Sequence, residues 1–294
     1  MADQASGAMA NLLLPAAVPA FKCPRGTKMW ILNLGSLNVD EGWLLAGVNG
    51  GSSSQPNPTN KRRTLMLIAG LIHHPDAGLI LFETGCAEDI ETQWGAQTTD
   101  VFPRTKYAVC HKLPEAIKAT GNDIKDIKAV IMGHLHMDHG GGLEHFFGST
   151  IPIYVHGEEL KHACWAAATR SESGLYLPDY LNLSKLRWET SNEERLDLWQ
   201  GITIYHAPGH TPGLSIMQVN LPNDGTWIWT TDQYHARENY YDDHPHGWLI
   251  RDHNSWVRSG KMIKRLQRLF QAKLIFGHDY DIASEHINNK PFYE

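Results

Sequence analysis

The sequence holds few cysteines and no thiolate motif. Four cysteines occur among the 294 residues, and no two of them form a Cys-x-x-Cys pair: Cys23, Cys86, Cys110 and Cys164. This spacing argues against a redox dithiol and against a structural zinc site built from thiolates. A few widely spaced cysteines without such a motif are most simply explained by a reducing compartment, so we expect a cytoplasmic protein.

Other absences narrow the class of protein further. The apolar stretch at residues 12–21 contains two prolines, lacks a basic flank and is too short to span a bilayer. A formal net charge of -6 disfavours nucleic-acid binding, which normally rests on an excess of Lys and Arg. No Gly-x-Ser-x-Gly elbow and no glycine-rich phosphate loop is present. We therefore expect neither a membrane nor a nucleic acid as partner, and neither covalent serine catalysis nor nucleotide binding.

Short apolar runs rich in Val, Ile and Leu alternate with segments of helical periodicity. The runs predict strands at Met29–Leu34, Leu65–Ile72, Leu79–Phe82, Ala129–Met132, Ile151–Val155, Ile202–His206 and Trp227–Thr231. The periodic segments predict helices at Leu113–Thr120, Glu158–Ala168 and Trp256–Gln271. Hairpin-like pairs early in the chain indicate mixed sheets, so we expect an α/β fold. Residues 1–28 are expected to form a flexible tail, and residues 29–294 a single domain.

One internal segment has the composition of a mobile surface loop. Residues 49–60 are rich in Gly, Ser, Pro and Asn. Such a loop could fold over a pocket, contact a second subunit of a homodimer, or act as a bare linker.

Histidine is the residue type in excess, with 17 in the chain. Residues 133–142 read Gly-His-Leu-His-Met-Asp-His-Gly-Gly-Gly, which places His134, His136, Asp138 and His139 directly after an apolar run. Neighbours at i and i+2 diverge on a helix, so a loop at the end of a strand must aim these side chains. Imidazole and carboxylate ligands without thiolate suit a zinc site that is open for chemistry.

Three more ligand-type residues follow later apolar runs. They are His210 in Gly-His-Thr-Pro-Gly, Asp232 after the run that ends at residue 231, and His278 in Phe-Gly-His-Asp. Each alone is a weak signal, but their order after the dense motif predicts one shared metal site.

These residues resemble the metallo-β-lactamase superfamily, whose His-x-His-x-Asp-His signature is matched at residues 134–139. The resemblance covers roughly residues 29–278 and implies an αββα sandwich with two mixed sheets. It implies two Zn²⁺ ions, with Asp232 between them. It assigns the other ligands to two groups: His134, His136 and His210 on one ion, and Asp138, His139 and His278 on the other.

More narrowly, the motifs look like those of N-acyl homoserine lactonases, and most of all like fungal γ-lactamases that open benzoxazolinone. Two positions depart from the lactonase pattern. Glu83 stands where many relatives have Asp, so the carboxylate that orients a ligand histidine is one methylene longer. Lactonases of this branch carry a substrate-side Tyr at the position of His235, whereas the tyrosine of this chain is Tyr234.

The resemblance implies a dinuclear zinc hydrolase that opens a small ring. Hydroxide attack on the ring carbonyl is expected, with Asp138 and Asp232 serving catalysis as well as metal binding, and with His235 or Tyr234 as a donor. An imidazole protonates a nitrogen leaving group better than a phenol does, which favours a cyclic amide or carbamate. The aromatic segment Tyr240–Trp256 would line a site for a flat aromatic substrate, or would simply pack the core or a dimer contact. The alternatives are an N-acyl homoserine lactonase and a non-catalytic zinc-binding protein.

Overall fold

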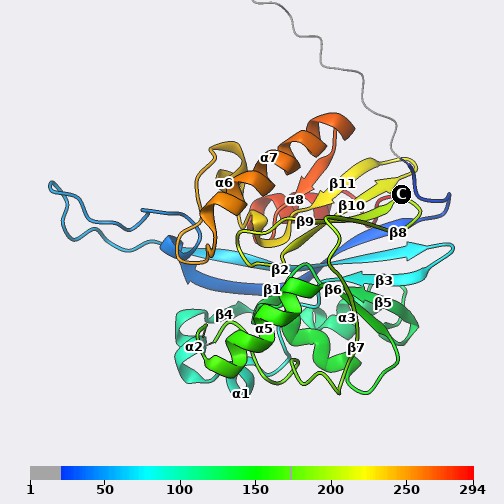
Figure 1. Cartoon of the computed structure of the whole chain (residues 1–294), viewed down its shortest axis with the longest axis horizontal. Coiled ribbons are helices and arrows are strands. Elements are labelled where there is room, and N and C mark those ends of the chain that lie inside the picture. The colour runs from blue at the N-terminus through cyan, green and yellow to red at the C-terminus, as the bar shows by residue number, and fades with distance from the viewer. Residues whose placement is uncertain (1–20, 173) are drawn as a thin grey trace, which may run out of the picture.

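Two β-sheets packed face to face form the centre of the computed structural model, which describes residues 21–172 and 174–294 (Figure 1). The seven-stranded sheet has the order β4-β1-β2-β3-β5-β6-β7, with β1 Lys28–Asp40, β2 Arg62–His74, β3 Gly78–Phe82, β4 Arg104–Lys106, β5 Ile127–Ile131, β6 Pro152–His156 and β7 Arg187–Ser191. The five-stranded sheet has the order β12-β11-β10-β9-β8, with β8 Arg195–Trp199, β9 Ile202–His206, β10 Ser215–Leu221, β11 Gly225–Trp229 and β12 Lys273–Ile275.

Helices cover the outer faces of both sheets. The helices are α1 Ile90–Trp94, α2 Ala96–Val101, α3 Leu113–Lys118, α4 Met137–Gly140, α5 Gly157–Thr169, α6 Arg237–Tyr241, α7 His253–Phe270 and α8 Tyr280–Asn289. Figure 1 shows α1, α3 and α5 on the side of the seven-stranded sheet and α7 on the opposite side. Both sheets mix parallel and antiparallel pairs. The expected α/β fold with two mixed sheets is confirmed.

The core has three apolar layers because the strands of the seven-stranded sheet bury both faces. On β2, Leu65, Leu67 and Leu71 face the helical side, whereas Met66 and Ile68 face the other sheet. A strand with side chains alternating between two buried faces must be apolar where both faces are covered, as β2 is from Leu65 to Ile72. The third layer lies between the five-stranded sheet and α7.

The two sheets approach closely where a glycine faces an aromatic ring. A Cβ atom added to Gly70 on β2 would lie 3.0 Å from the ring of Trp229 on β11. Gly70 therefore leaves the space in which the indole packs between the sheets.

Most predicted elements are present, with shifted ends. The run expected at Met29–Leu34 continues to Asp40 as β1, and the helix expected at Trp256–Gln271 begins at His253, where Asp252 caps it. The sequence did not predict β10, although this strand is buried along its whole length. Its alternating polar residues Gln218 and Asn220 interrupt the apolar run.

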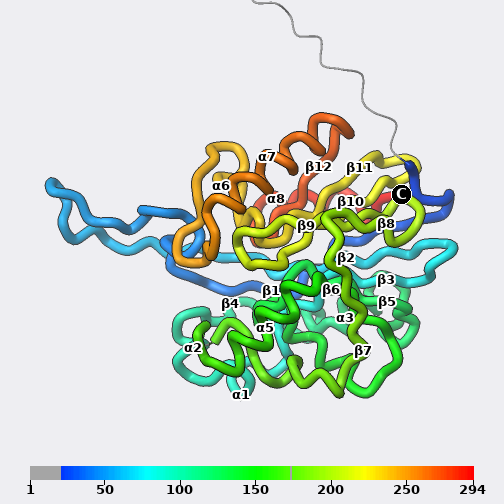
Figure 2. Tube along the Cα trace, in the orientation of Figure 1, coloured from blue at the N-terminus to red at the C-terminus, as the bar shows by residue number. Residues whose placement is uncertain are grey.

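The expected N-terminal tail lies largely outside the described residues. Its described end contacts the five-stranded sheet, since the amide of Cys23 donates to Asn220 O at 2.8 Å. The predicted surface loop, residues 49–60, projects from the body of the protein (Figure 2). Asn49 closes its base by donating to Asp40 Oδ1 and Lys61 O.

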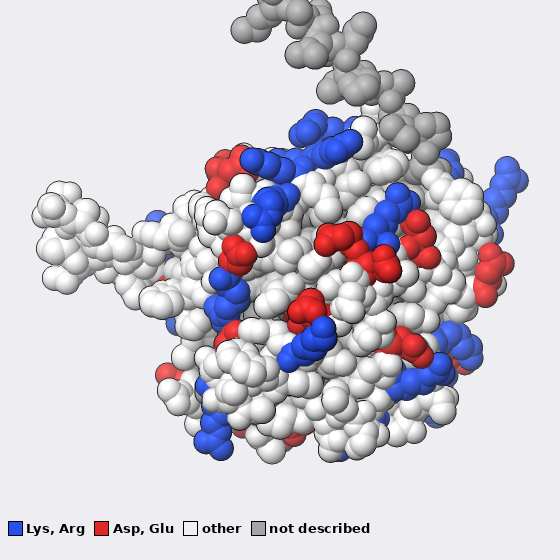
Figure 3. Space-filling model, viewed as in Figure 1, with Lys and Arg blue, Asp and Glu red and all other residues white. Residues whose placement is uncertain are grey.

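Charge is unevenly distributed on the visible face. Lys and Arg side chains gather over α7, while the projecting loop carries almost no charge (Figure 3). Among the helices of residues 21–172 and 174–294, none has the length and apolar character that crossing a membrane requires.

Candidate metal centre

The dense histidine motif stands at the end of a buried strand. Strand β5 pairs in parallel with β3 and β6, so the chain leaves it at one edge of the sheet. His134 follows within three residues, and the short helix α4 begins inside the motif at Met137. The later candidate ligands follow strands of the other sheet: His210 after β9, Asp232 after β11 and His278 after β12. The centre thus forms where ends of strands from both sheets meet.

His134, His136 and His210, which we term the three-histidine group, lie together beside Asp232. Their candidate ligand atoms all lie within 4.8 Å of one another, and the four residues are buried. His210 Nε2 is 3.0 Å from His136 Nδ1, and it is 3.4 Å from Asp232 Oδ2. The structure therefore brings together the first predicted ligand set.

Asp138, His139 and His278, which we term the acidic group, form a second cluster. Their candidate ligand atoms also lie within 4.8 Å of one another. The Nε2 atoms of His139 and His278 are 3.2 Å apart, and His278 Nε2 is 3.5 Å from Asp138 Oδ2.

Asp232 lies between the two groups and presents one oxygen to each. Its Oδ1 is 3.1 Å from His278 Nε2 and 3.4 Å from His139 Nε2, both of the acidic group. Its Oδ2 faces the three-histidine group, 3.4 Å from His210 Nε2 and 3.7 Å from His134 Nε2. This is the arrangement a bridging carboxylate requires.

Glu83 supports the acidic group from behind. Its Oε2 pairs with His139 Nδ1, and its Oε1 accepts from Gly133 N at 2.8 Å. Glu83 itself has a left-handed backbone with φ +64°. The longer carboxylate at this position therefore still reaches the ring of a candidate ligand, and it fixes which nitrogen of His139 points into the centre.

The two groups differ in electrostatics. Burial lowers the pKa of His136 to about 3 and holds the pKa values of His134 and His210 well below the usual range. Burial also acts on His139, but the carboxylates of Glu83 and Asp232 outweigh it and hold its pKa well above the usual value. The pKa of His278 is raised as well, because Asp232 outweighs the effect of burial.

Buried atoms without partners indicate that the residues fit bound cations. Among the described residues, His134 Nε2, His136 Nε2 and Asp232 Oδ1 are buried and make no hydrogen bond. Leaving such atoms unpaired costs about 1–3 kcal/mol each, so they are normally satisfied. Nitrogen and oxygen donors converging from two sides suit a pair of zinc ions.

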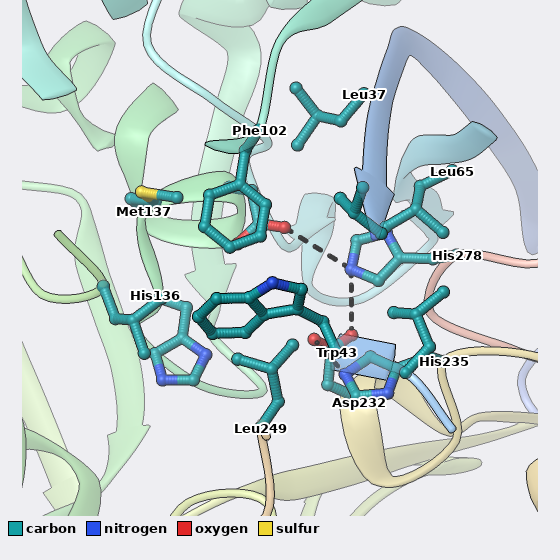
Figure 4. A pocket seen from close by; sticks show the side chains of 14 residues that line it. Leu37, Trp43, Leu65, Phe102, His136, Met137, Asp232, His235, Leu249 and His278 are labelled. Carbon is teal, nitrogen blue, oxygen red and sulfur yellow. Dashed lines mark ion pairs between the residues drawn. The ribbon is translucent and has the colours of Figure 1, made fainter. Parts of the chain in front are cut away.

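A cavity opens onto this centre. It encloses about 420 Å³ of space, part of it open to solvent. Its polar wall is formed by His136, Asp138, Asp232, His235 and His278. Figure 4 shows the labelled residues of this wall around one space, beside Trp43 and Phe102. The remaining lining side chains are apolar: Leu37, Val39, Trp43, Leu44, Leu65, Phe102, Met137, Leu175 and Leu249.

The structure separates the two candidate donors. His235 lines the cavity with its Nε2 3.2 Å from Asp232 Oδ2. Tyr234 instead packs in the core layer under α7, where its ring contacts Trp256 and Phe276. Only His235 is thus brought to the centre.

The segment expected to line the site does so in small part. Of Tyr240–Trp256, Leu249 lines the cavity, whereas Tyr240 and Trp256 pack in the core. His246 was not singled out from the sequence, yet its ring lies 4.1 Å from that of His235. Only its proximity in the fold reveals it, as is also true of Trp43 and Phe102.

Comparisons with known proteins agree with this geometry. A family model for the metallo-beta-lactamase superfamily matches residues 68–278. The N-acyl homoserine lactonase AiiB of Agrobacterium fabrum is 25% identical over 279 residues, which cover 92% of this chain and 100% of that protein. The lactonase AttM of the same organism is 28% identical over 236 residues, covering 76% of this chain and 85% of AttM.

Solved structures show the same fold. A single-substitution mutant of AiiA from Bacillus thuringiensis, with N-decanoyl-L-homoserine bound at its active site, superposes with a TM-score of 0.73 at 21% identity, covering 91% of this chain and 97% of that one. The dizinc quorum-quenching lactonase AidC superposes with a TM-score of 0.62 at 17% identity, covering 90% of each chain. The expected likeness to fungal γ-lactamases is not shown by these comparisons.

Proposed function

The chain belongs to the metallo-β-lactamase superfamily of metal-dependent hydrolases, and we propose that it opens a small, uncharged lactone ring, with N-acyl homoserine lactones as the substrate class. The observation that carries the proposal is the position of two ligand groups, joined by Asp232, at one wall of an otherwise apolar cavity. The named relatives are N-acyl homoserine lactonases, which favours this substrate over a lactam.

The exposure of the ligands to the cavity supports catalysis over simple metal storage. One candidate ligand of the three-histidine group, two of the acidic group and the shared carboxylate line the cavity: His136, Asp138, His278 and Asp232. A structural metal site is closed by its ligands, whereas a catalytic site leaves a position for water and substrate. The non-catalytic alternative is therefore disfavoured.

The lining also limits the substrate. None of the described residues that line the cavity is Lys or Arg, so outside the metal centre no such side chain would pair with a phosphate or a carboxylate of the substrate. The apolar wall, with Trp43 and Phe102, suits an uncharged ring that carries an apolar substituent.

Two zinc ions, when bound, would polarise the ring carbonyl and make hydroxide available near neutral pH. His235 lies beside the shared carboxylate, with its Nε2 3.2 Å from Asp232 Oδ2, and within the described residues neither of its ring nitrogens makes a hydrogen bond. His235 can then donate to the oxygen that develops charge or to the leaving atom. The apolar wall orients the ring and excludes water from its other faces.

A second candidate, hydrolysis of a cyclic amide or carbamate, rests on one observation. The donor that lines the cavity is the imidazole of His235, while the phenol of Tyr234 is in the core. A departing nitrogen needs a proton more than a departing alkoxide does, and an imidazole supplies it more readily.

One experiment separates these readings. Purified protein loaded with zinc is incubated with N-hexanoyl and N-decanoyl homoserine lactone and, in parallel, with benzoxazolinone, and ring opening is followed by chromatography. We expect turnover of the lactones. Faster turnover of benzoxazolinone would favour the second candidate, and zinc-loaded protein that opens none of these rings would contradict both.

A further inference from the structure

Glu159 is a fully buried carboxylate in the first turn of α5, with 0% of its surface exposed. Within residues 21–172 and 174–294 it forms no ion pair and instead accepts four hydrogen bonds. Oε1 accepts from Leu135 N at 2.9 Å and from the Tyr176 hydroxyl at 3.1 Å. Oε2 accepts from the Thr211 hydroxyl at 2.6 Å and from Gly213 N at 3.2 Å.

Three of the four donors belong to the two loops that carry the three-histidine group. Leu135 stands between His134 and His136, and Thr211 directly follows His210. Leu135 and Thr211 each donate to a different oxygen of Glu159, so one side chain joins loops that are far apart in the sequence. The fourth donor, Tyr176, places its ring 4.8 Å from that of His136.

We propose that Glu159 is a positioning residue that sets the metal affinity of the three-histidine group and leaves that of the acidic group unchanged. The inference rests on the ligand sets of the proposed function. None of the four hydrogen bonds of Glu159 reaches Asp138, His139 or His278, whose support comes from Glu83, Asp232 and Met66 O.

The chemistry of the donors makes the site specific for a carboxylate. Two donors are backbone N–H groups, which can only donate, and two are hydroxyls, which can rotate and accept. In Glu159→Gln the amide NH₂ must replace one oxygen. Whichever oxygen it replaces, it faces the amide of Leu135 or of Gly213, so one of the two loops loses its backbone hydrogen bond to this side chain.

The loop after His210 packs tightly against Glu159. A Cβ atom on Gly213 would collide with the backbone of Glu159, so the loop after His210 lies directly on the start of α5. An N–H group facing the amide NH₂ introduced by Glu159→Gln at this close approach would repel it, and we expect the shift to reach the ring of His210 three residues earlier.

The test is a zinc titration of the full-length protein with buffered free zinc, read as bound equivalents. We expect two equivalents for the wild type. Glu159→Gln should weaken one equivalent by about 10-fold to 100-fold and the other by less than about threefold, in line with partners that orient metal ligands elsewhere. Thr211→Val, which removes one hydrogen bond and keeps the shape, should weaken the same equivalent by about threefold to tenfold.

Glu158→Gln is the matched control, because Glu158 lies beside Glu159 but is exposed and pairs with Lys161. It should change neither equivalent. Combining Glu159→Gln with Glu83→Gln should weaken both equivalents, since the two carboxylates support different groups.

The outcomes separate the inference from the proposed function. Unchanged binding in both Glu159→Gln and Thr211→Val would overturn the positioning role, as would equal weakening of both equivalents, which a merely structural role predicts. A double variant that keeps one equivalent intact would show that the two carboxylates act on one site, and would also overturn it. Wild-type protein that binds no zinc would overturn the proposed function together with the inference.

Discussion

The two halves of the centre hold similar ligands in opposite electrostatic surroundings. The three-histidine group consists of imidazoles whose pKa values are lowered by burial, so they are neutral and ready to bind a cation. In the acidic group, carboxylates including Glu83 and Asp232 raise the pKa values of His139 and His278. Without a cation these rings keep their protons to a higher pH than ordinary imidazoles do, and a cation must displace those protons to bind. Burial therefore keeps the three-histidine group neutral and ready for a cation, whereas in the acidic group nearby carboxylates favour protonated rings.

The largest effect is expected from substituting Asp232, because both ligand groups share this carboxylate. Asp232 presents one oxygen to each group, so Asp232→Asn should weaken both zinc equivalents by at least about 100-fold and abolish most ring-opening activity. Bound metal by elemental analysis and the rate of ring opening check this. Retention of either equivalent at wild-type affinity would show that Asp232 does not serve both groups.

Substituting His235 should affect the reaction without affecting either half. His235→Phe should lower kcat by about 100-fold, the typical cost of losing one donor to a developing charge, while both equivalents stay bound. The companion variant Tyr234→Phe alters a hydroxyl that faces Gly260 in the core and should change kcat by less than about twofold. Equal losses in the two variants would refute the assignment of His235 as the donor.

Substituting Glu83 should act on the acidic group alone. In Glu83→Gln the carboxamide keeps the size of the side chain but removes the charge beside His139 Nδ1. We expect the affinity of that half for zinc to fall by about 10-fold to 100-fold, with the three-histidine group unchanged. Zinc titration measures both, and weakening of the three-histidine group alone would contradict the separation of the halves.

The smallest effect, and the most direct measure of the electrostatic difference, is the pH dependence of zinc binding. Because the pKa values of His139 and His278 are raised, these rings gain protons first as pH falls, and the acidic group should lose affinity by about tenfold per pH unit for each proton displaced. The three-histidine group, with the pKa of His136 lowered to about 3, should hold its cation at lower pH. Equilibrium dialysis at pH 6, 7 and 8 tests this order, and simultaneous release would contradict it.

Sequence reasoning located the candidate ligands because their chemistry is concentrated at strand ends. His134, His136, Asp138 and His139 fall within six residues, which no ordinary surface loop would require. His210, Asp232 and His278 are single residues, and they could be predicted as ligands only because each follows an apolar run later in the chain. Each of these ligands follows an apolar run within a few residues, so the strand and the ligand after it can be recognised together from a short stretch of sequence.

The supporting residues could not be found in the same way. In sequence, Glu159 is one of two acidic residues in the first turn of a helix, where an exposed carboxylate is common. Its hydrogen-bond partners are 17 to 54 residues away, so only the folded chain reveals its role. Strand β10 was missed for a related reason, because Asn220 is polar but buried, and Gln218 and Thr226 donate to it from within the same sheet.

The ligands reach the centre from both sheets, four from the exit of β5 and the rest from the exits of β9, β11 and β12. Cations held there would also cross-link the two halves of the sandwich, so part of their binding energy becomes resistance to unfolding. At a free concentration 1,000 times the Kd, one such ion adds about 4 kcal/mol. The free metal concentration would then set the stability of the folded protein as well as its catalytic activity.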